Sequence, residues 1–170
     1  AILVRSGDKT VLIDAGDRSA NTVAQLKAIG VEHLDLVVAT HPHADHIGRM
    51  KQIVEGFEIG LYLDNGMRHT TTTYRELMET VESREINTRS AVTGMALKMG
   101  EEATFTVYHP DETHLRNTRS DLNSNSVVLL LEHGENKMLF TGDAEDPTEH
   151  ALLMKDIGDI DLLKVAHHGS

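Results

Sequence analysis

Four apolar runs in this chain of 170 residues end directly in a histidine or an aspartate. The runs VLI, LVVAT, MLFTG and LLKVA are followed in turn by Asp14, by residues 41–46, by Asp143 and by the pair His167 and His168. Short runs of this kind are typical of buried β-strands. Because open α/β sheets bind ligands at the carboxyl ends of their strands, we expect these ends to converge if the strands align in one sheet.

Helical patterns alternate with the apolar runs and predict an α/β fold. Residues 1–38 predict the order strand, strand, helix, strand, with the helix closed by Gly30. Further helices are predicted from about residue 47 to 54, over TTYRELMETVESRE with Thr72 or Thr73 as its cap, and over DPTEHALLMKDIG. The other predicted strands are EIGLYLD, ATFTVYH, the two arms of the hairpin SVVLLLEHGENKMLFTGDAE, and DLLKVA. A polar loop is predicted for residues 111–124.

Composition and charge limit the function. The length fits a single domain, residues 1–170, and no apolar stretch approaches the roughly 18 to 20 residues of a membrane span. No signal peptide is recognisable, and the compartment stays open. The chain has no Cys, so a metal must be held by imidazole and carboxylate groups. A net charge of −11 disfavours tight non-specific binding to phosphate backbones.

The segment THPHADHIGR contains the pattern His-x-His-x-Asp-His. Alternate residues of an extended or turning loop share a side, so His41 and His43 can bind one ion while Asp45 and His46 face a second. Three crowded imidazoles would repel one another on protonation and offer no packing advantage, which argues against a purely structural role. A mixed nitrogen and oxygen set favours zinc, with manganese or iron as alternatives.

The remaining donors are single residues, for which structural roles are alternatives. Asp143 is the candidate for a carboxylate that bridges two ions, and His168 or His167 would supply a further imidazole. Asp14, in the turn-like DAG, either bonds nearby backbone amides or orients the histidine loop. The segment NSNS at residues 123–126 is interpreted as a polar loop that enters a strand.

Taken in order, LIDAG, THPHADHIGR, LFTGDAE and KVAHHGS resemble the metallo-β-lactamase fold hydrolases. Within that superfamily, NSNSVVLLLEHGENKMLFTGDAE followed by LLKVAHHGS is similar to the soluble C-terminal domain of the competence DNA-uptake protein ComEC and its stand-alone relatives. The resemblance covers nearly the whole chain and is weakest between residues 66 and 100. It implies an αββα sandwich with a dinuclear metal site at one sheet edge, and we expect this sequence to be truncated at both ends.

The resemblance also assigns ligands to the two ions. For one ion it implies His41, His43 and His168, with His167 as the alternative; for the other it implies Asp45 and His46, and Asp143 lies between them. The family's second glycine after HIG is Arg49 here, and this cation and Lys164 are candidate contacts for an anionic substrate. The family's last histidine ligand would lie beyond residue 170, so we expect the second ion to be weakly bound or absent.

These residues predict a metal-dependent hydrolase that uses a metal-bound hydroxide, with Asp45 and Asp143 as its catalytic carboxylates. A phosphodiesterase or nuclease is favoured, acting on a small molecule or a single-stranded nucleic acid, because the chain shows no basic stripe that would suit a duplex. The alternative is hydrolysis of a lactam, lactone or thioester, as in a β-lactamase or a glyoxalase II-like thioesterase. A degenerate domain that binds without catalysis is the third reading, and the oligomeric state stays open.

Overall fold

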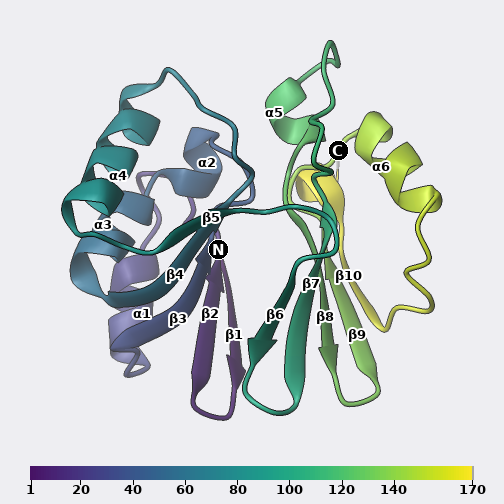
Figure 1. Ribbon diagram of the computed structural model, residues 1–170. Coiled ribbons are helices and arrows are strands. Elements are labelled where there is room, and N and C mark those ends of the chain that lie inside the picture. Colours follow the sequence, from purple (N-terminus) through teal and green to yellow (C-terminus); the bar gives the residue numbers. More distant parts are fainter. Residues whose placement is uncertain (170) are drawn as a thin grey trace. The chain divides into compact units, whose positions relative to one another are not determined.

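The computed structural model describes residues 1–169, with the side chain of His168 excepted, and divides into two compact units. The first unit is Ala1–Ser90 and the second is Ala91–Ser170. Figure 1 shows that each unit has its own sheet and its own helices. The predicted α/β class is therefore confirmed, while the single domain stays a prediction. None of the helices among the described residues is long and apolar enough to cross a membrane.

The first sheet has the strand order β1-β2-β3-β4-β5. Its strands are β1 (Ile2–Ser6), β2 (Lys9–Ile13), β3 (His33–Val38), β4 (Glu58–Asp64) and β5 (Thr88–Ser90). Only β1 and β2 pair antiparallel, and every other neighbouring pair is parallel. Parallel neighbours need crossover connections. Those between β2 and β5 contain the helices α1 (Thr22–Ala28), α2 (Ala44–Ile47), α3 (Met50–Gly56) and α4 (Thr72–Ser83).

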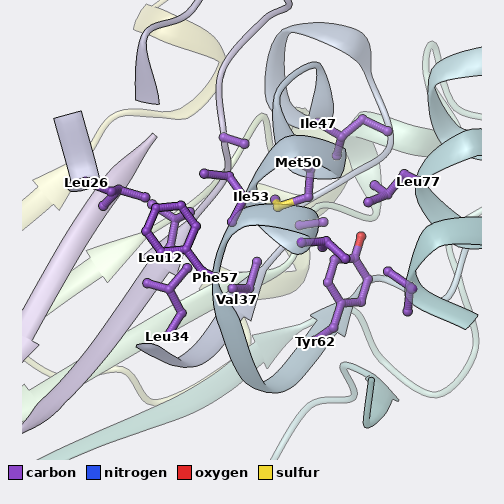
Figure 2. Packing of buried hydrophobic residues seen from close by; sticks show 14 of the residues in the cluster. Leu12, Leu26, Leu34, Val37, Ile47, Met50, Ile53, Phe57, Tyr62 and Leu77 are labelled. Carbon is purple, nitrogen blue, oxygen red and sulfur yellow. The ribbon is translucent and has the colours of Figure 1, made fainter. Parts of the chain in front are cut away.

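The helices of the first unit cover one face of its sheet with an aliphatic core (Figure 2). The strands contribute residues such as Leu12, Val37 and Tyr62, and the helices contribute residues such as Ile53 and Leu77. Each of these side chains is almost fully buried, and burial of one such side chain contributes about 1.5 to 3 kcal/mol. This core fixes the neighbouring carboxyl ends of β2 and β3, which is where the predicted ligands of this unit begin.

The helix predicted from about residue 47 to 54 is in fact two short helices, because α2 ends at Ile47 and α3 begins at Met50. The amide of Arg49 donates to the carbonyl of Gly16 at 3.2 Å rather than to a carbonyl of α2, and this contact with another segment interrupts the helix. The cap of α4 also differs from the prediction, since Thr71 accepts the amide of Tyr74 through its side chain.

The second sheet has the order β10-β9-β8-β7-β6, and only β9 and β10 pair parallel. Its strands are β6 (Ala96–Met99), β7 (Ala103–His109), β8 (Val128–His133), β9 (Asn136–Phe140) and β10 (Leu162–Lys164). The helices of this unit are α5 (Asp121–Ser124), α6 (Asp146–Leu153) and the 3-10 turn η1 (Ala166–Gly169). Strand β7 alternates buried and half-buried residues as predicted, and the predicted hairpin is β8 with β9.

Three further differences from the sequence-based prediction involve tertiary contacts. Strands β5 and β6 were not predicted, because β5 is short and exposed and β6 lies in a methionine-rich segment. Helix α5 occupies the end of the predicted polar loop, and α6 ends at Leu153 rather than near residue 158. The strand ends that carry ligands lie in two sheets rather than one, with Asp14 and residues 41–46 in the first unit and Asp143 in the second.

Candidate metal centre

The histidine segment connects β3 to α2 in the first unit. His43 is the N-cap residue of α2, with extended backbone (φ −73°, ψ 149°), and its carbonyl accepts the amides of His46 and Ile47 at 3.0 Å. The chain bends at residues 40–42, is extended at His43 and is helical after it. His41 and His43 therefore precede the helix, whereas Asp45 and His46 lie in its first turn.

Asp14 contacts this segment from the end of the neighbouring strand β2. Its buried carboxylate accepts the Thr40 amide at 2.8 Å, the Thr40 hydroxyl at 2.9 Å and Nδ1 of His46 at 2.7 Å. The backbone of Asp14 is left-handed (φ 56°), a conformation that is uncommon outside glycine. Because an ionised carboxylate can only accept hydrogen bonds, Nδ1 of His46 carries the proton and Nε2 keeps the lone pair that a metal requires.

Thr40 fixes the tautomer of His41, the second buried histidine, in a similar way. Its hydroxyl hydrogen is donated to Asp14, and the hydroxyl oxygen lies 3.2 Å from Nδ1 of His41. With its single hydrogen already used, this hydroxyl can only accept from His41, so Nδ1 of His41 is protonated and Nε2 carries its lone pair. Asp14 and Thr40 together direct Nε2 of both buried histidines away from the strand ends.

The donor atoms of the four predicted ligands form two close pairs. Nε2 of His41 lies 3.0 Å from Nδ1 of His43, and Nε2 of His46 lies 3.5 Å from Oδ2 of Asp45. Two ligands of one tetrahedral zinc ion, each about 2.0 to 2.1 Å from the metal, are about 3.3 Å apart. The rings of His41 and His46 are neighbours, with centroids 4.1 Å apart. The donor set and its spacing therefore fit divalent metal ions.

Two residues that were not among the predicted metal ligands lie beside the histidines. The ring of His69, from the loop before α4, has its centroid 5.9 Å from that of His43. Asp64 ends β4, lines a small cavity together with His41, and accepts the amide of Gly66 at 2.8 Å. Burial raises the pKa of the Asp64 carboxyl. An aspartate at the end of the apolar run EIGLYLD follows the same pattern as Asp14, and that signal was available in the sequence.

Asp143 follows β9 in the second unit and is 2% exposed. Its amide donates to the hydroxyl of Ser126 at 3.2 Å, and Oδ2 of its carboxylate lies 4.0 Å from Nε2 of His167. The amide of His167 donates to the carbonyl of Gly142 at 3.3 Å, and its backbone is left-handed (φ 45°). A carboxylate and an imidazole from the ends of β9 and β10 thus lie side by side. The side chain of His168 lies outside the described residues.

The segment NSNS is not the exposed polar loop that its composition suggests, because all four residues are buried. The carbonyl of Ser124 accepts the Thr148 hydroxyl at 2.6 Å and Nε2 of His109 at 2.9 Å. Burial lowers the pKa of His109, which keeps this ring neutral. Four small polar residues directly before the run VVLLL were the available signal for a buried hydrogen-bonded turn, and this turn supplies the Ser126 hydroxyl to Asp143.

The two cations predicted to contact a substrate have different surroundings. Arg49 is half-buried at the junction of α2 and α3, and its Nε donates to the carbonyl of Ala20 at 2.9 Å. The ammonium group of Lys164 donates to the carbonyls of Val165 at 2.9 Å and Gly142 at 3.4 Å. Arg49 retains most of its guanidinium donors, whereas Lys164 is engaged with backbone around the turn that carries Asp143.

Comparisons with known proteins show which proteins this chain is similar to. The chain is 49% identical over 53 residues, or 31% of its length, to Recombination protein 2 of Haemophilus influenzae, and 27% identical over its whole length to Competence protein ComA of Neisseria gonorrhoeae. It spans only 6% and 22% of these two relatives. Among solved structures, the metallo-beta-lactamase fold protein YhfI from Bacillus subtilis superposes with a TM-score of 0.57 at 16% identity, covering 95% of this chain and 60% of YhfI.

The structural likeness shows the fold, and the relatives named for competence and recombination agree with the resemblance drawn from sequence. The family model of the metallo-beta-lactamase superfamily matches residues 1–170, which is the entire chain. The protein therefore belongs to the metallo-beta-lactamase superfamily.

Proposed function

We propose that this protein is a metal-dependent phosphodiesterase with a dinuclear site and that its substrate is a single-stranded nucleic acid. The observation that carries the proposal is the pairing of donor atoms in the first unit, at 3.0 Å between His41 and His43 and at 3.5 Å between Asp45 and His46. Relatives named for competence and recombination support nucleic acid as the substrate class. The half-buried Arg49 supports an anionic substrate.

The proposed ligands are divided between two ions, with zinc as the favoured metal. His41 and His43 would hold the first ion together with His168, or with His167 as the alternative; Asp45 and His46 would hold the second, and Asp143 would be shared. When bound, two such ions lower the pKa of a water molecule and stabilise negative charge on the oxygens of a phosphodiester. Imidazole and carboxylate suit zinc, and also manganese or iron.

The chain's own residues prepare the site for those ions. Asp14 holds the proton of His46 on Nδ1, and the Thr40 hydroxyl does the same for His41. Both rings thereby present Nε2 without a change of tautomer when a metal binds. The rings are also locked by burial, since His41 is 1% and His46 4% exposed, so little side-chain entropy is lost on binding.

The test is hydrolysis by the zinc-loaded protein of single-stranded DNA, bis-p-nitrophenyl phosphate, a thioester, a lactone and a β-lactam. We expect the highest catalytic efficiency on the phosphodiesters, and rates on DNA that fall steeply with salt. Asp143→Asn should lower those rates by about a thousandfold, which corresponds to about 4 kcal/mol of transition-state stabilisation. The melting temperature reports whether the variant keeps its fold.

Three outcomes would contradict the proposal. Faster turnover of a neutral lactam, lactone or thioester, with rates independent of salt, would assign the protein to a different reaction class. Turnover by Asp143→Asn within a few-fold of the parent would remove this residue from the site. Less than about one equivalent of tightly bound metal per chain, in protein never exposed to a chelator, would support a non-catalytic domain.

A further inference from the structure

A groove of about 310 Å³ lies in the first unit between the turn after β2, the junction of α2 with α3, and the beginning of α4. Its lining includes three cations, one carboxylate and several neutral polar groups, among them Arg18, Arg49, Lys51, Glu76, Gln52 and Thr73. In a chain with a net charge of −11, three cations around one groove are a marked local excess of positive charge. The groove begins two residues after His46, because Gly48 is part of its wall.

The two guanidinium groups are held in place by neutral partners. Nη2 of Arg18 donates to the Thr73 hydroxyl at 2.7 Å, and Nε of Arg49 donates to the carbonyl of Ala20 at 2.9 Å. No described residue forms an ion pair with either guanidinium. A guanidinium has five N–H donors, so most of the donors of each arginine remain for a ligand. Arginine at such a site suits bidentate recognition of a phosphate.

The acidic groups near the groove are engaged elsewhere. The carboxylate of Asp17 accepts both the amide and the hydroxyl of Ser19 at 2.7 Å. The carboxylate of Glu76 lies 3.3 Å from the ammonium group of Lys51, which offsets its charge. Hydrogen bonds from Ser19 and, to a lesser degree, the charge of Arg49 lower the pKa of Asp17, so this carboxylate offsets part of that charge. Neither carboxylate forms an ion pair with an arginine, and the three cations of the groove outnumber these two acids.

The backbone brings Arg18 and Arg49 to the same groove through a close approach at Gly48. A Cβ at this position would lie 2.6 Å from the amide nitrogen of Arg18 and 2.6 Å from the carbonyl carbon of Asp17. Only a glycine lets the turn after β2 approach α2 so closely. The groove is therefore part of the same local architecture that positions the histidine segment.

Gln52 adds an amide oxygen that has no hydrogen-bond partner in the part of the chain that the structure describes. Its Oε1 is buried and forms no hydrogen bond with any described residue, although the side chain lines the groove. A buried amide oxygen without a partner costs about 1 to 3 kcal/mol; a water molecule that donates to it would relieve that cost, whereas a phosphate oxygen, itself an acceptor, would not. A half-turn of the amide would present its two N–H donors instead.

We propose that this groove binds a backbone phosphate of the single-stranded nucleic acid, outside the metal centre, through Arg18 and Arg49 with Gln52 as a neutral partner. The inference rests on the proposed function for its choice of substrate. Its physical basis is independent, because two fixed guanidiniums without ion pairs and an unsatisfied amide share one groove. Two arginines can hold one phosphate of a flexible strand while its bases stay free, so the groove confers affinity for the backbone rather than for a base sequence.

Binding is measured by fluorescence anisotropy with a labelled oligothymidylate of about 12 nucleotides, in the presence of a chelator. Without metal there is no turnover, so the result stands whether or not the protein hydrolyses phosphodiesters. We expect Arg18→Ala combined with Arg49→Ala to weaken binding about tenfold. The slope of log K against log salt should also become shallower, by about 0.7 for each phosphate that the variant no longer neutralises.

Matched variants separate the groove from general charge and from misfolding. Arg5→Ala removes one positive charge, half of what the double variant removes, from an exposed position on β1 that does not line the groove, and binding should stay within about twofold. Glu76→Gln removes the acid opposite Lys51 and should strengthen binding by about twofold to threefold, a gain that misfolding cannot produce. The melting temperature of each variant checks its fold.

Equal binding by the double variant and the parent would overturn the proposal, as would equal losses of affinity for Arg5→Ala and the double variant. Thymidine monophosphate serves as the competitor, and affinity within about threefold of the oligonucleotide would assign the groove to a free phosphate instead. If the oligonucleotide binds as expected but the metal-loaded protein cleaves no phosphodiester, the proposed function fails while the groove proposal stands.

Discussion

The two units support their predicted ligands in different ways. In the first unit the ligands are contiguous in sequence, and they rest on Asp14, Thr40 and the glycine contact at Gly48. In the second unit Asp143 is a single residue in a turn, and its amide bonds a hydroxyl from Ser126, seventeen residues earlier. The contiguous set is supported by several hydrogen bonds to one buried carboxylate at the end of a neighbouring strand, whereas the bond from Ser126 to the turn of Asp143 is a single neutral one. Substitutions of the residues that support the ligands of the first unit should therefore reduce stability or metal affinity more than the equivalent substitutions in the second unit.

Gly48→Ala should cause the largest loss of stability. The added Cβ would meet three backbone atoms, at 2.5 Å from the carbonyl oxygen of Ala44 and at 2.6 Å from atoms of Asp17 and Arg18. Backbone must move to relieve these contacts, and we expect a loss of about 3 kcal/mol in the free energy of unfolding. Urea unfolding measures it.

Gly56→Ala is the matched control, because Gly56 lies in the last turn of α3 and an added Cβ there meets no atom within 4 Å. This substitution should be neutral or stabilising by up to about 1 kcal/mol, since alanine loses less backbone entropy on folding. Similar decreases in stability for both glycines would mean that the close approach at Gly48 is not what holds the histidine segment.

Asp14→Asn should weaken metal binding about 10-fold to 100-fold by removing the charged acceptor that fixes His46. Asparagine tolerates the left-handed backbone at this position, so the substitution adds little strain. Competition with a chelating dye measures the affinity. Glu85→Asn is the control, because Glu85 is exposed and also left-handed (φ 53°), and metal affinity should not change. An unchanged affinity for Asp14→Asn would refute its supporting role.

Ser126→Ala should have a smaller effect, about threefold to tenfold on metal affinity, because it removes one neutral hydrogen bond to the amide of Asp143. Ser120→Ala is the control in the same segment. Ser120 caps α5 by accepting the amide of Asn123, so its removal costs about 1 kcal/mol of stability without acting on Asp143. If Ser126→Ala proved more damaging than Asp14→Asn, the contrast between the two units would be reversed.

The smallest effect is expected from Asp111→Asn in the second unit. Burial raises the pKa of Asp111, but hydrogen bonds and charge from Lys155, at 2.6 Å, outweigh it and the net pKa is lowered from 3.8. The ionised pair therefore stabilises the protein above pH 3.8, and this contribution disappears as pH falls through the lower folded pKa. Because Asp111 is 47% exposed, we expect no more than about 1 kcal/mol.

Urea unfolding between about pH 3 and 7 tests this prediction, since Asp111→Asn should be less stable than the parent at neutral pH and converge with it in acid. Asp35→Asn offers the equivalent test in the first unit, because hydrogen bonds to Lys9 and Thr10 lower the pKa of Asp35 despite its burial. A constant difference across this pH range would show that Asp111 acts through packing rather than through charge.

Elements with a strong local pattern were predictable. Strands β4 and β7 agree with their predicted ranges, because their apolar runs are bounded by turn residues that stop a strand locally. The short β5 and the break between α2 and α3 were not predicted. The break depends on the amide of Arg49 bonding the carbonyl of Gly16, a partner 33 residues earlier that no local pattern reveals.

The candidate ligands of the first unit were also predictable from the sequence, because three histidines and one aspartate within six residues indicate metal binding rather than a structural role. The burial of the NSNS segment was not predicted, although its position directly before the run VVLLL was a signal, because small polar residues are common both in exposed loops and in buried hydrogen-bonded turns. His69 was not predicted as a ligand, because it is a single polar residue whose neighbour His43 comes from another part of the chain. Asp64 was missed although it ends an apolar run as Asp14 does.

The sequence by itself determined the superfamily, the α/β class and the positions of the contiguous donors, because periodic burial and local crowding leave their signature along the chain. Only the tertiary structure decided which nitrogen of His41 and His46 is protonated, which hydroxyl supports Asp143, and that Arg18 and Arg49 share a groove. These features depend on partners brought together by packing of the core. A hydrogen bond is specified by the position of both its groups, and the sequence records only their order.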